Sequence, residues 1–142
     1  MGVVSKGKSP KKCVTKYQCV LVVDDVHEQA LIMAGVLRKA KYQVICVYDG
    51  PWALEVAQKR RPALAIVNWL MPGMDGLEVI RRLRADPAAK SMKIILSSAN
   101  MSGRTTFKQA GADAFLALPF TEDALLRTVA SLLPPSISIE CR

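Results

Sequence analysis

ALAIVNWLMPGMDGLEVIRRLR, residues 63–84, contains the local pattern from which the fold of this chain is predicted. It begins with a continuous apolar run over 63–68, which is typical of a strand covered on both faces. The turn MPG follows, and Asp75 then stands where it can cap a helix over 75–84. The apolar side of that helix would carry Leu77, Val79, Ile80 and Leu83. The stretch therefore predicts one buried strand followed by one amphipathic helix.

The same alternation of a short apolar run and a longer amphipathic stretch occurs on both sides of this unit. We predict further strands over 18–24, 42–47, 92–97 and 114–118. We predict further helices over 27–40, 51–60, 101–110 and 121–133. Five βα units with short connections and right-handed crossovers give an α/β fold, a doubly wound five-stranded parallel sheet with the flavodoxin-like strand order.

Composition limits the number of domains and the class of protein. The 142 residues suit one domain, and 51% hydrophobic with 23% charged residues is typical of a globular protein. Five of the 20 basic side chains and none of the 12 acidic ones lie in residues 1–16. We predict a flexible basic N-terminal arm over 1–16, a folded body over 17–133 and a C-terminal tail over 134–142. Because there is neither a secretory signal nor an apolar run of the ~20 residues that span a bilayer, we expect a cytoplasmic protein without a membrane span.

Polar residues stand where several predicted strands end. Asp24 and Asp25 follow the first strand, Asn68 ends the third, and Ser98 follows the fourth. In doubly wound sheets, ligands bind beyond the carboxyl ends of the strands. The sequence therefore predicts a functional site at this edge of the sheet.

Four fragments in register, VLVVDD, NWLMPGMDGLEVIRRLR, IILSSA and FLALPF, resemble the landmarks of bacterial two-component response-regulator receiver domains over about residues 18–133. The resemblance implies a (βα)5, CheY-like receiver fold. In that family an acidic pair and an aspartate hold Mg²⁺, and the aspartate accepts a phosphoryl group. Carried onto this chain, the metal ligands are Asp24, Asp25 and the backbone carbonyl of Leu70, and the phosphoacceptor position is Asn68.

The same resemblance assigns three further positions: those of the residues that, in the family, bind the phosphoryl group or change conformation when it is attached. The hydroxyl that contacts the phosphoryl group corresponds to Ser98, the switch aromatic to Phe115, and the lysine that neutralises the phosphoryl charge to Leu118. Phe115 has no hydroxyl, so we expect it to rest inward as part of the core.

This chain departs from the family at two of these positions. The Asn68 amide has no anionic oxygen and cannot attack a phosphoryl donor, so aspartyl phosphorylation at the usual site is excluded. Leu118 provides no cation to neutralise a bound phosphoryl group. Because an anion and a cation are lost together, we interpret the chain as a natural degenerate receiver, a pseudo-receiver, and not as the product of one engineered change. We expect no enzyme activity.

Three details of the site stay open at this point. Asp24, Asp25, the Leu70 carbonyl and the Asn68 amide oxygen offer ligands for weak Mg²⁺ binding, or else Asp25 caps the first helix while Asp24 is solvated. The Ser98 hydroxyl either bonds to Asn68 or satisfies the end of its strand. Trp69 either borders the pocket or packs against the body.

The leading hypothesis is a receiver that acts by protein–protein interaction. Its partner would be a histidine kinase, an output protein or another signalling protein, bound through the face made by the fourth helix, fifth strand and fifth helix, around Met101, Phe107 and Phe115. One alternative is a phosphate-independent receiver that responds to a metal or small ligand. Another is an adaptor that binds nucleic acid or a membrane surface through its lysine-rich arm. Nucleic acid is the weaker partner, since no aromatic residue interleaves those lysines.

Overall fold

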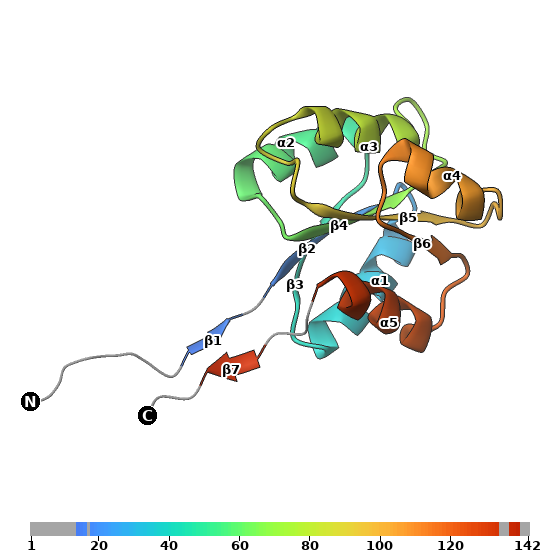
Figure 1. The fold of residues 1–142 in the computed structure, drawn as a ribbon. Helices are drawn as coiled ribbons and strands as arrows, with labels where there is room; N and C mark the ends of the chain where they lie inside the picture. The colour runs from blue at the N-terminus through green and yellow to red at the C-terminus, as the bar shows by residue number, and fades with distance from the viewer. Residues whose placement is uncertain (1–13, 17, 134–136, 140–142) are drawn as a thin grey trace, which may run out of the picture.

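The computed structural model describes residues 14–16, 18–133 and 137–139. Its body is a parallel sheet of five strands in the order β3-β2-β4-β5-β6 (Figure 1). The strands are β2 (Cys19–Val23), β3 (Gln43–Val47), β4 (Leu64–Asn68), β5 (Lys93–Ser98) and β6 (Ala114–Ala117). The helices are α1 (His27–Lys39), α2 (Gly50–Arg60), α3 (Gly76–Ala85), α4 (Gly103–Ala110) and α5 (Glu122–Leu132). The predicted α/β fold and strand order are confirmed.

Helices cover both faces of the sheet, with α1 and α5 on one face and α2, α3 and α4 on the other (Figure 1). Successive residues of β2 enter different cores because side chains alternate across a strand. Val20 and Val22 belong to the core beneath α1 and α5, whereas Leu21 and Val23 belong to the core beneath α2 and α3. The inner strands β2 and β4 are therefore buried on both faces, as their apolar runs indicated.

The structure confirms most of the residues that were predicted to cap the helix starts. Asp75 caps α3, its side chain accepting a hydrogen bond from the Glu78 amide at 3.0 Å. Thr121 caps α5 in the same way, by accepting from the Ala124 amide at 3.0 Å. The exception is α1, where Val26 is the N-cap residue and no side chain caps the helix. The alternative that Asp25 caps α1 is therefore wrong.

A second, two-stranded antiparallel sheet joins segments from the two ends of the chain (Figure 1). In it β1 (Val14–Lys16) pairs with β7 (Ile137–Ile139). These residues were predicted to belong to a flexible arm and to a tail, and the pairing between them was not predicted. The β-branched residues of VTK and ISI favour extended structure, but each segment is too short to predict a strand by itself. The predicted arm otherwise lies outside the described residues, and its role stays a prediction.

Arg84, near the end of α3, binds several segments at the amino-terminal edge of the main sheet. Its guanidinium donates to the Gly111 carbonyl at 2.8 Å and to the Met92 carbonyl at 2.6 Å. It also pairs with the Asp113 carboxylate at 2.8 Å, and that carboxylate accepts from the Ile94 amide at 2.9 Å. One side chain thus joins α3 to the starts of β5 and β6. We call this set the amino-edge network.

No helix in the described ranges is both long and apolar enough to cross a membrane.

Candidate functional site

The carboxyl ends of β2, β4 and β5 bring Asp24, Asn68 and Ser98 to the same edge of the sheet. Gly76 allows the chain to turn tightly there. A Cβ atom on Gly76 would lie 2.2 Å from the Asn68 carbonyl oxygen, so only glycine fits where α3 begins against the end of β4. The Gly76 amide also donates to the Trp69 carbonyl at 2.7 Å. The loop from β4 to α3 is therefore held close against the site.

Asp24 is buried, with 1% of its surface exposed. Its carboxylate accepts hydrogen bonds from the Val26 amide at 3.0 Å and from the Gln29 side-chain amide. Burial raises the pKa of Asp24, and the nearby charge of Asp25 adds to that rise, while the hydrogen bonds oppose it. The alternative in which Asp24 is solvated is therefore wrong, because the β2 end and the first turn of α1 enclose the side chain.

The Asn68 amide nitrogen lies among three oxygen atoms. Nδ2 donates to Asp24 Oδ1 at 3.3 Å, to Asp25 Oδ1 at 3.4 Å and to the Leu70 carbonyl at 3.2 Å. An amide has two hydrogens for these three acceptors, so the bonds are long and shared. The three acceptors are the atoms that the resemblance assigned to a metal ion, and in this structure they surround an N–H donor.

This donor set can be tested against Mg²⁺. Two carboxylates and a carbonyl are ligands that Mg²⁺ accepts, whereas an N–H group repels a cation. Turning the Asn68 amide by 180° about its terminal torsion would direct Oδ1 at the metal position instead, and such torsions are soft. The residues therefore fit Mg²⁺ in that second amide orientation. No group of three or more His, Cys, Asp and Glu side chains that would hold a metal occurs among the described residues.

Ser98 and Leu118 line one cleft together with Asn68. Ser98 is 2% exposed, and its Oγ accepts a hydrogen bond from the Asn100 amide at 3.0 Å. Of the two roles left open for this hydroxyl, the strand-end bond is therefore the one present. The Leu118 amide donates to the Ser98 carbonyl at 3.0 Å, which holds the two residues side by side.

A cleft of about 390 Å³ opens between these residues. Its lining consists of Gln29, Asn68, Leu70, Ser98, Ala99, Leu118 and Pro119. None of these lining residues is charged, and one of them is Leu118, which the resemblance placed at the lysine position. Trp69 is not among them and packs partly buried against the α2–α3 core, as the packing alternative predicted. The cleft beside Asn68 is therefore neutral.

Phe115 on β6 is partly buried against the core beneath α2 and α3. A Cβ atom on Gly103, at the start of α4, would lie 2.4 Å from the Phe115 ring. The Arg104 guanidinium lies 5.9 Å from the centre of the ring, within the range of a cation–π contact. The ring is therefore covered by α4, close to the inward position expected from its lack of a hydroxyl. Met101, at the edge of the same face, is 50% exposed.

Three features near the site were not predicted. Gln29 reaches Asp24 from the first turn of α1, and no motif marks that position. His27 stacks on Tyr48 with ring centres 3.7 Å apart, and Tyr48 meets Trp52 edge-on at 5.8 Å. A partly apolar groove of about 520 Å³ lies between α1 and the segment that leads from β6 into α5, lined by Val26, Glu28, Gln29, Ile32, Val36, Pro119, Phe120 and Glu122. The sequence contained one signal for this groove: α1 has more apolar residues than its buried side needs, and Leu31 and Ile32 remain exposed.

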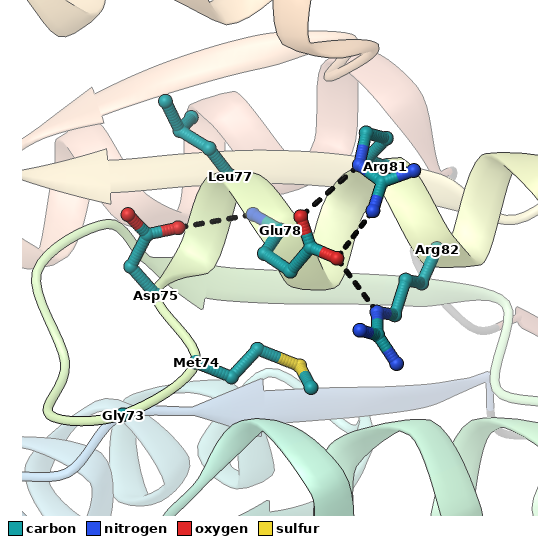
Figure 2. A pocket seen from close by; sticks show the side chains of 7 residues that line it. All are labelled: Gly73, Met74, Asp75, Leu77, Glu78, Arg81 and Arg82. Carbon is teal, nitrogen blue, oxygen red and sulfur yellow. Dashed lines mark hydrogen bonds and ion pairs between the residues drawn. The ribbon is translucent and has the colours of Figure 1, made fainter.

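A separate depression, which neither Asp24 nor Asp25 lines, lies over the start of α3 (Figure 2). There Glu78 is bound by Arg81 and Arg82, which lower the pKa of its carboxyl to about 2 through hydrogen bonds and charge. Figure 2 shows both guanidinium groups turned onto this one carboxylate, with Asp75 capping the helix beside it. Since exposed ion pairs of this kind stabilise weakly, we assign the depression no chemistry.

Comparisons with known proteins agree with this geometry. A family model described as "Response regulator receiver domain" matches residues 20–130. Response regulator PleD of Caulobacter vibrioides is 33% identical over 115 residues, which are 80% of this chain and 25% of that protein. Sporulation initiation phosphotransferase F of Bacillus subtilis is 29% identical over 115 residues, which are 81% of this chain and 93% of that protein. The chain thus spans about a quarter of PleD and nearly all of the sporulation protein.

Solved structures give the same result. Chemotaxis response regulator CheY4 of Vibrio cholerae superposes with a TM-score of 0.78 at 31% identity, covering 83% of this chain and 100% of that one. The receiver domain of sensor histidine kinase PA1611 of Pseudomonas aeruginosa gives a TM-score of 0.76 at 28% identity, covering 82% and 98%. That structure has a magnesium ion coordinated in its active site cleft.

Proposed function

The chain belongs to the response regulator receiver domain family of two-component signalling, and we propose that it is a pseudo-receiver that accepts no phosphoryl group and acts by contact with a signalling protein. The observation that carries the proposal is the Asn68 side chain. It presents an amide N–H group to Asp24, Asp25 and the Leu70 carbonyl, at the position where the family has an aspartate.

The chemistry of phosphoryl transfer supports this proposal. Forming an acyl phosphate requires a carboxylate oxygen that attacks phosphorus while the donor's leaving group departs, and a neutral amide is too weak a nucleophile. A cation must also offset the charge of the transferred group. Removing one such stabilising group typically lowers a rate roughly 100-fold to 1,000-fold. Asn68 provides no carboxylate oxygen and Leu118 provides no cation, so both requirements are unmet in the cleft.

The arrangement also explains how the two departures are tolerated together. In a receiver with aspartate at position 68, three carboxylates would repel one another and require a metal ion or a lysine. Here the Asn68 amide contributes no charge and donates hydrogen bonds to the remaining two carboxylates. Loss of the acceptor therefore lowers the need for a cation at position 118, because two carboxylates remain where a receiver with aspartate at position 68 has three.

We propose the face formed by α4, β6 and α5 as the surface that contacts the partner. Receiver domains interact with signalling proteins such as histidine kinases. On this face Met101 is exposed, and a shallow depression of about 420 Å³ is lined by Ala114, Phe115, Ala124, Arg127, Thr128 and Ser131. Since Phe115 is held beneath α4 without a phosphoryl group to report, we expect this face to stay in one state.

Phosphorylation of purified variants tests the proposal. Wild type, Asn68→Asp, Leu118→Lys and the double variant are incubated with Mg²⁺ and acetyl phosphate, and intact mass is measured. We expect no phosphate on the wild type, some on Asn68→Asp and more on the double variant, because only the double variant regains both nucleophile and cation.

Asn100→Asp is the matched control, since it places a new carboxylate beside the site but outside the acceptor position. It should remain unphosphorylated. A phosphate mapped to Asp24 or Asp25 of the wild type would overturn the proposal. Equal phosphorylation of Asn68→Asp and the double variant would show that position 118 has been assigned the wrong role.

A further inference from the structure

The neutral cleft beside Asn68 contains buried polar groups whose hydrogen-bonding capacity is not used. Asn68 is 9% exposed, and its amide oxygen accepts no hydrogen bond from the described residues. The Ser98 oxygen accepts from the Asn100 amide, but the hydroxyl hydrogen has no acceptor within the described part of the chain. Buried polar groups are normally paired, so an unused acceptor and an unused donor on two residues that line one cleft point to a ligand.

The charges around the cleft limit what that ligand can be. An anion would meet no cation among the lining residues and would approach the carboxylates of Asp24 and Asp25. A cation would be drawn past the cleft to those carboxylates, which do not line it, and in the observed orientation the Asn68 N–H group lies between them. A neutral ligand is therefore favoured over either charged class.

The positions of the polar and apolar groups then define the ligand's chemistry. Asn68 Oδ1 requires a donor, and the Ser98 hydroxyl requires an acceptor. Leu70, Leu118 and Pro119 line the cleft with apolar surface. A primary carboxamide has an N–H donor and a carbonyl acceptor bonded to the same carbon atom, and a short branched aliphatic body would cover the apolar wall.

We propose that this cleft binds a neutral primary carboxamide, with its NH₂ group donating to Asn68 Oδ1 and its carbonyl oxygen accepting from the Ser98 hydroxyl. The carboxamide belongs either to a small molecule or to a glutamine or asparagine side chain of a partner protein. This inference rests on the proposed function, because it uses the cleft that phosphoryl chemistry would otherwise occupy.

Three probes of nearly equal shape and different charge test the proposal: isobutyramide, isobutyrate and isobutylammonium. Each is titrated into the full ¹⁵N-labelled chain, and the Asn68 side-chain NH₂ signal and the Ser98, Ala99 and Leu118 amide signals are followed. We expect saturable shifts with isobutyramide and a dissociation constant at least tenfold lower than for either charged probe. No saturable shift, or equal affinity for isobutyrate, would overturn the proposal.

Matched variants separate the proposed contacts from general effects on the fold. Ser98→Ala removes the donor and should weaken isobutyramide binding about tenfold. Ser97→Ala, at a buried serine of the same strand that does not line the cleft, should leave the affinity unchanged. Leu118→Lys should reverse the preference from isobutyramide to isobutyrate. Equal losses in Ser98→Ala and Ser97→Ala would contradict the assigned contact.

A fourth probe distinguishes the two sources of the amide. N-acetylglutamine methylamide presents the same carboxamide within a peptide unit, so tighter binding of this compound than of isobutyramide assigns the cleft to a partner's side chain, and weaker binding assigns it to a free small molecule. The phosphorylation test above is independent. A phosphorylated wild type would sink the pseudo-receiver proposal, whereas failure of isobutyramide to bind would sink the carboxamide proposal alone.

Discussion

Carboxylates at the two edges of the main sheet have different partners. At the amino-terminal edge Asp113 pairs with the Arg84 guanidinium at 2.8 Å and also accepts from the Ile94 amide. At the carboxyl edge Asp24 and Asp25 face the Asn68 amide at 3.3 Å and 3.4 Å, and no salt bridge within the described residues includes either of them. One edge therefore has paired charge, and the other has charge that is only partly offset.

This difference indicates what each edge contributes. The charge-assisted hydrogen bonds of the Arg84 guanidinium stabilise the fold because they join α3 to the starts of β5 and β6. The carboxyl edge instead retains a buried carboxylate with a raised pKa, and the Asn68 Oδ1 atom and the Ser98 hydroxyl hydrogen have no partner within the described residues. Such groups are costly for stability and typical of functional sites. The following variants test whether stability and function are divided between the edges in this way.

The largest effect is expected at Gly76, where backbone fit holds the carboxyl edge together. Gly76→Ala places a Cβ atom 2.2 Å from the Asn68 carbonyl oxygen, so the β4–α3 loop must move, at a cost of about 3 kcal/mol in unfolding free energy. Urea denaturation measures the change. Gly35→Ala is the control, because nothing lies within 4 Å of its new Cβ and the helix should become more stable by about 1 kcal/mol. Similar losses in both variants would contradict the account of this turn.

The second-largest loss of stability is expected in the amino-edge network. Arg84→Met keeps an unbranched apolar stem but removes the guanidinium donors to Gly111, Met92 and Asp113, and should lower the unfolding free energy by about 2 kcal/mol. Arg82→Met lies two residues away on the same helix, with 53% of its side chain exposed against 24% for Arg84. It should change stability by no more than about 0.5 kcal/mol. If the two variants lose the same stability, the network has no special role.

The smallest effect tests the unneutralised charge of the carboxyl edge. Because burial raises the pKa of Asp24 in the folded state, its contribution to stability is present at acid pH and is lost as pH rises through that raised pKa. Asp24→Asn in metal-free buffer should therefore gain stability relative to wild type at neutral pH and lose that advantage below about pH 4. Thermal unfolding across this range measures it. An advantage that grows toward acid pH would reverse the assigned sign.

The sequence predicted the elements and the location of the site because both depend on local patterns. Apolar runs gave the strands, Asp75 and Thr121 marked helix starts, and the parallel order placed Asp24, Asn68 and Ser98 at one edge. These signals are read from neighbours in sequence. They give the positions of the site residues but not the hydrogen bonds that each residue makes.

The remaining features depend on contacts between distant residues or on side-chain orientation. Arg84 meets Asp113 across 29 residues, and β1 meets β7 across nearly the whole chain, so neither pairing has a local signal. The burial of Asp24 depends on Gln29 and on the angle at which α1 begins. The direction of the Asn68 amide is decided by three acceptors from two different loops.

The central claim is that the Asn68 N–H group lies where a cation would otherwise bind the acidic oxygens. Calorimetric titration of Mg²⁺ into wild type and Asn68→Asp tests it most directly, since the variant replaces the donor with an anionic oxygen. We predict that Asn68→Asp binds Mg²⁺ at least about tenfold more tightly than wild type, in which the amide must first turn over. Equal affinities, or tighter binding by the wild type, would contradict the claim.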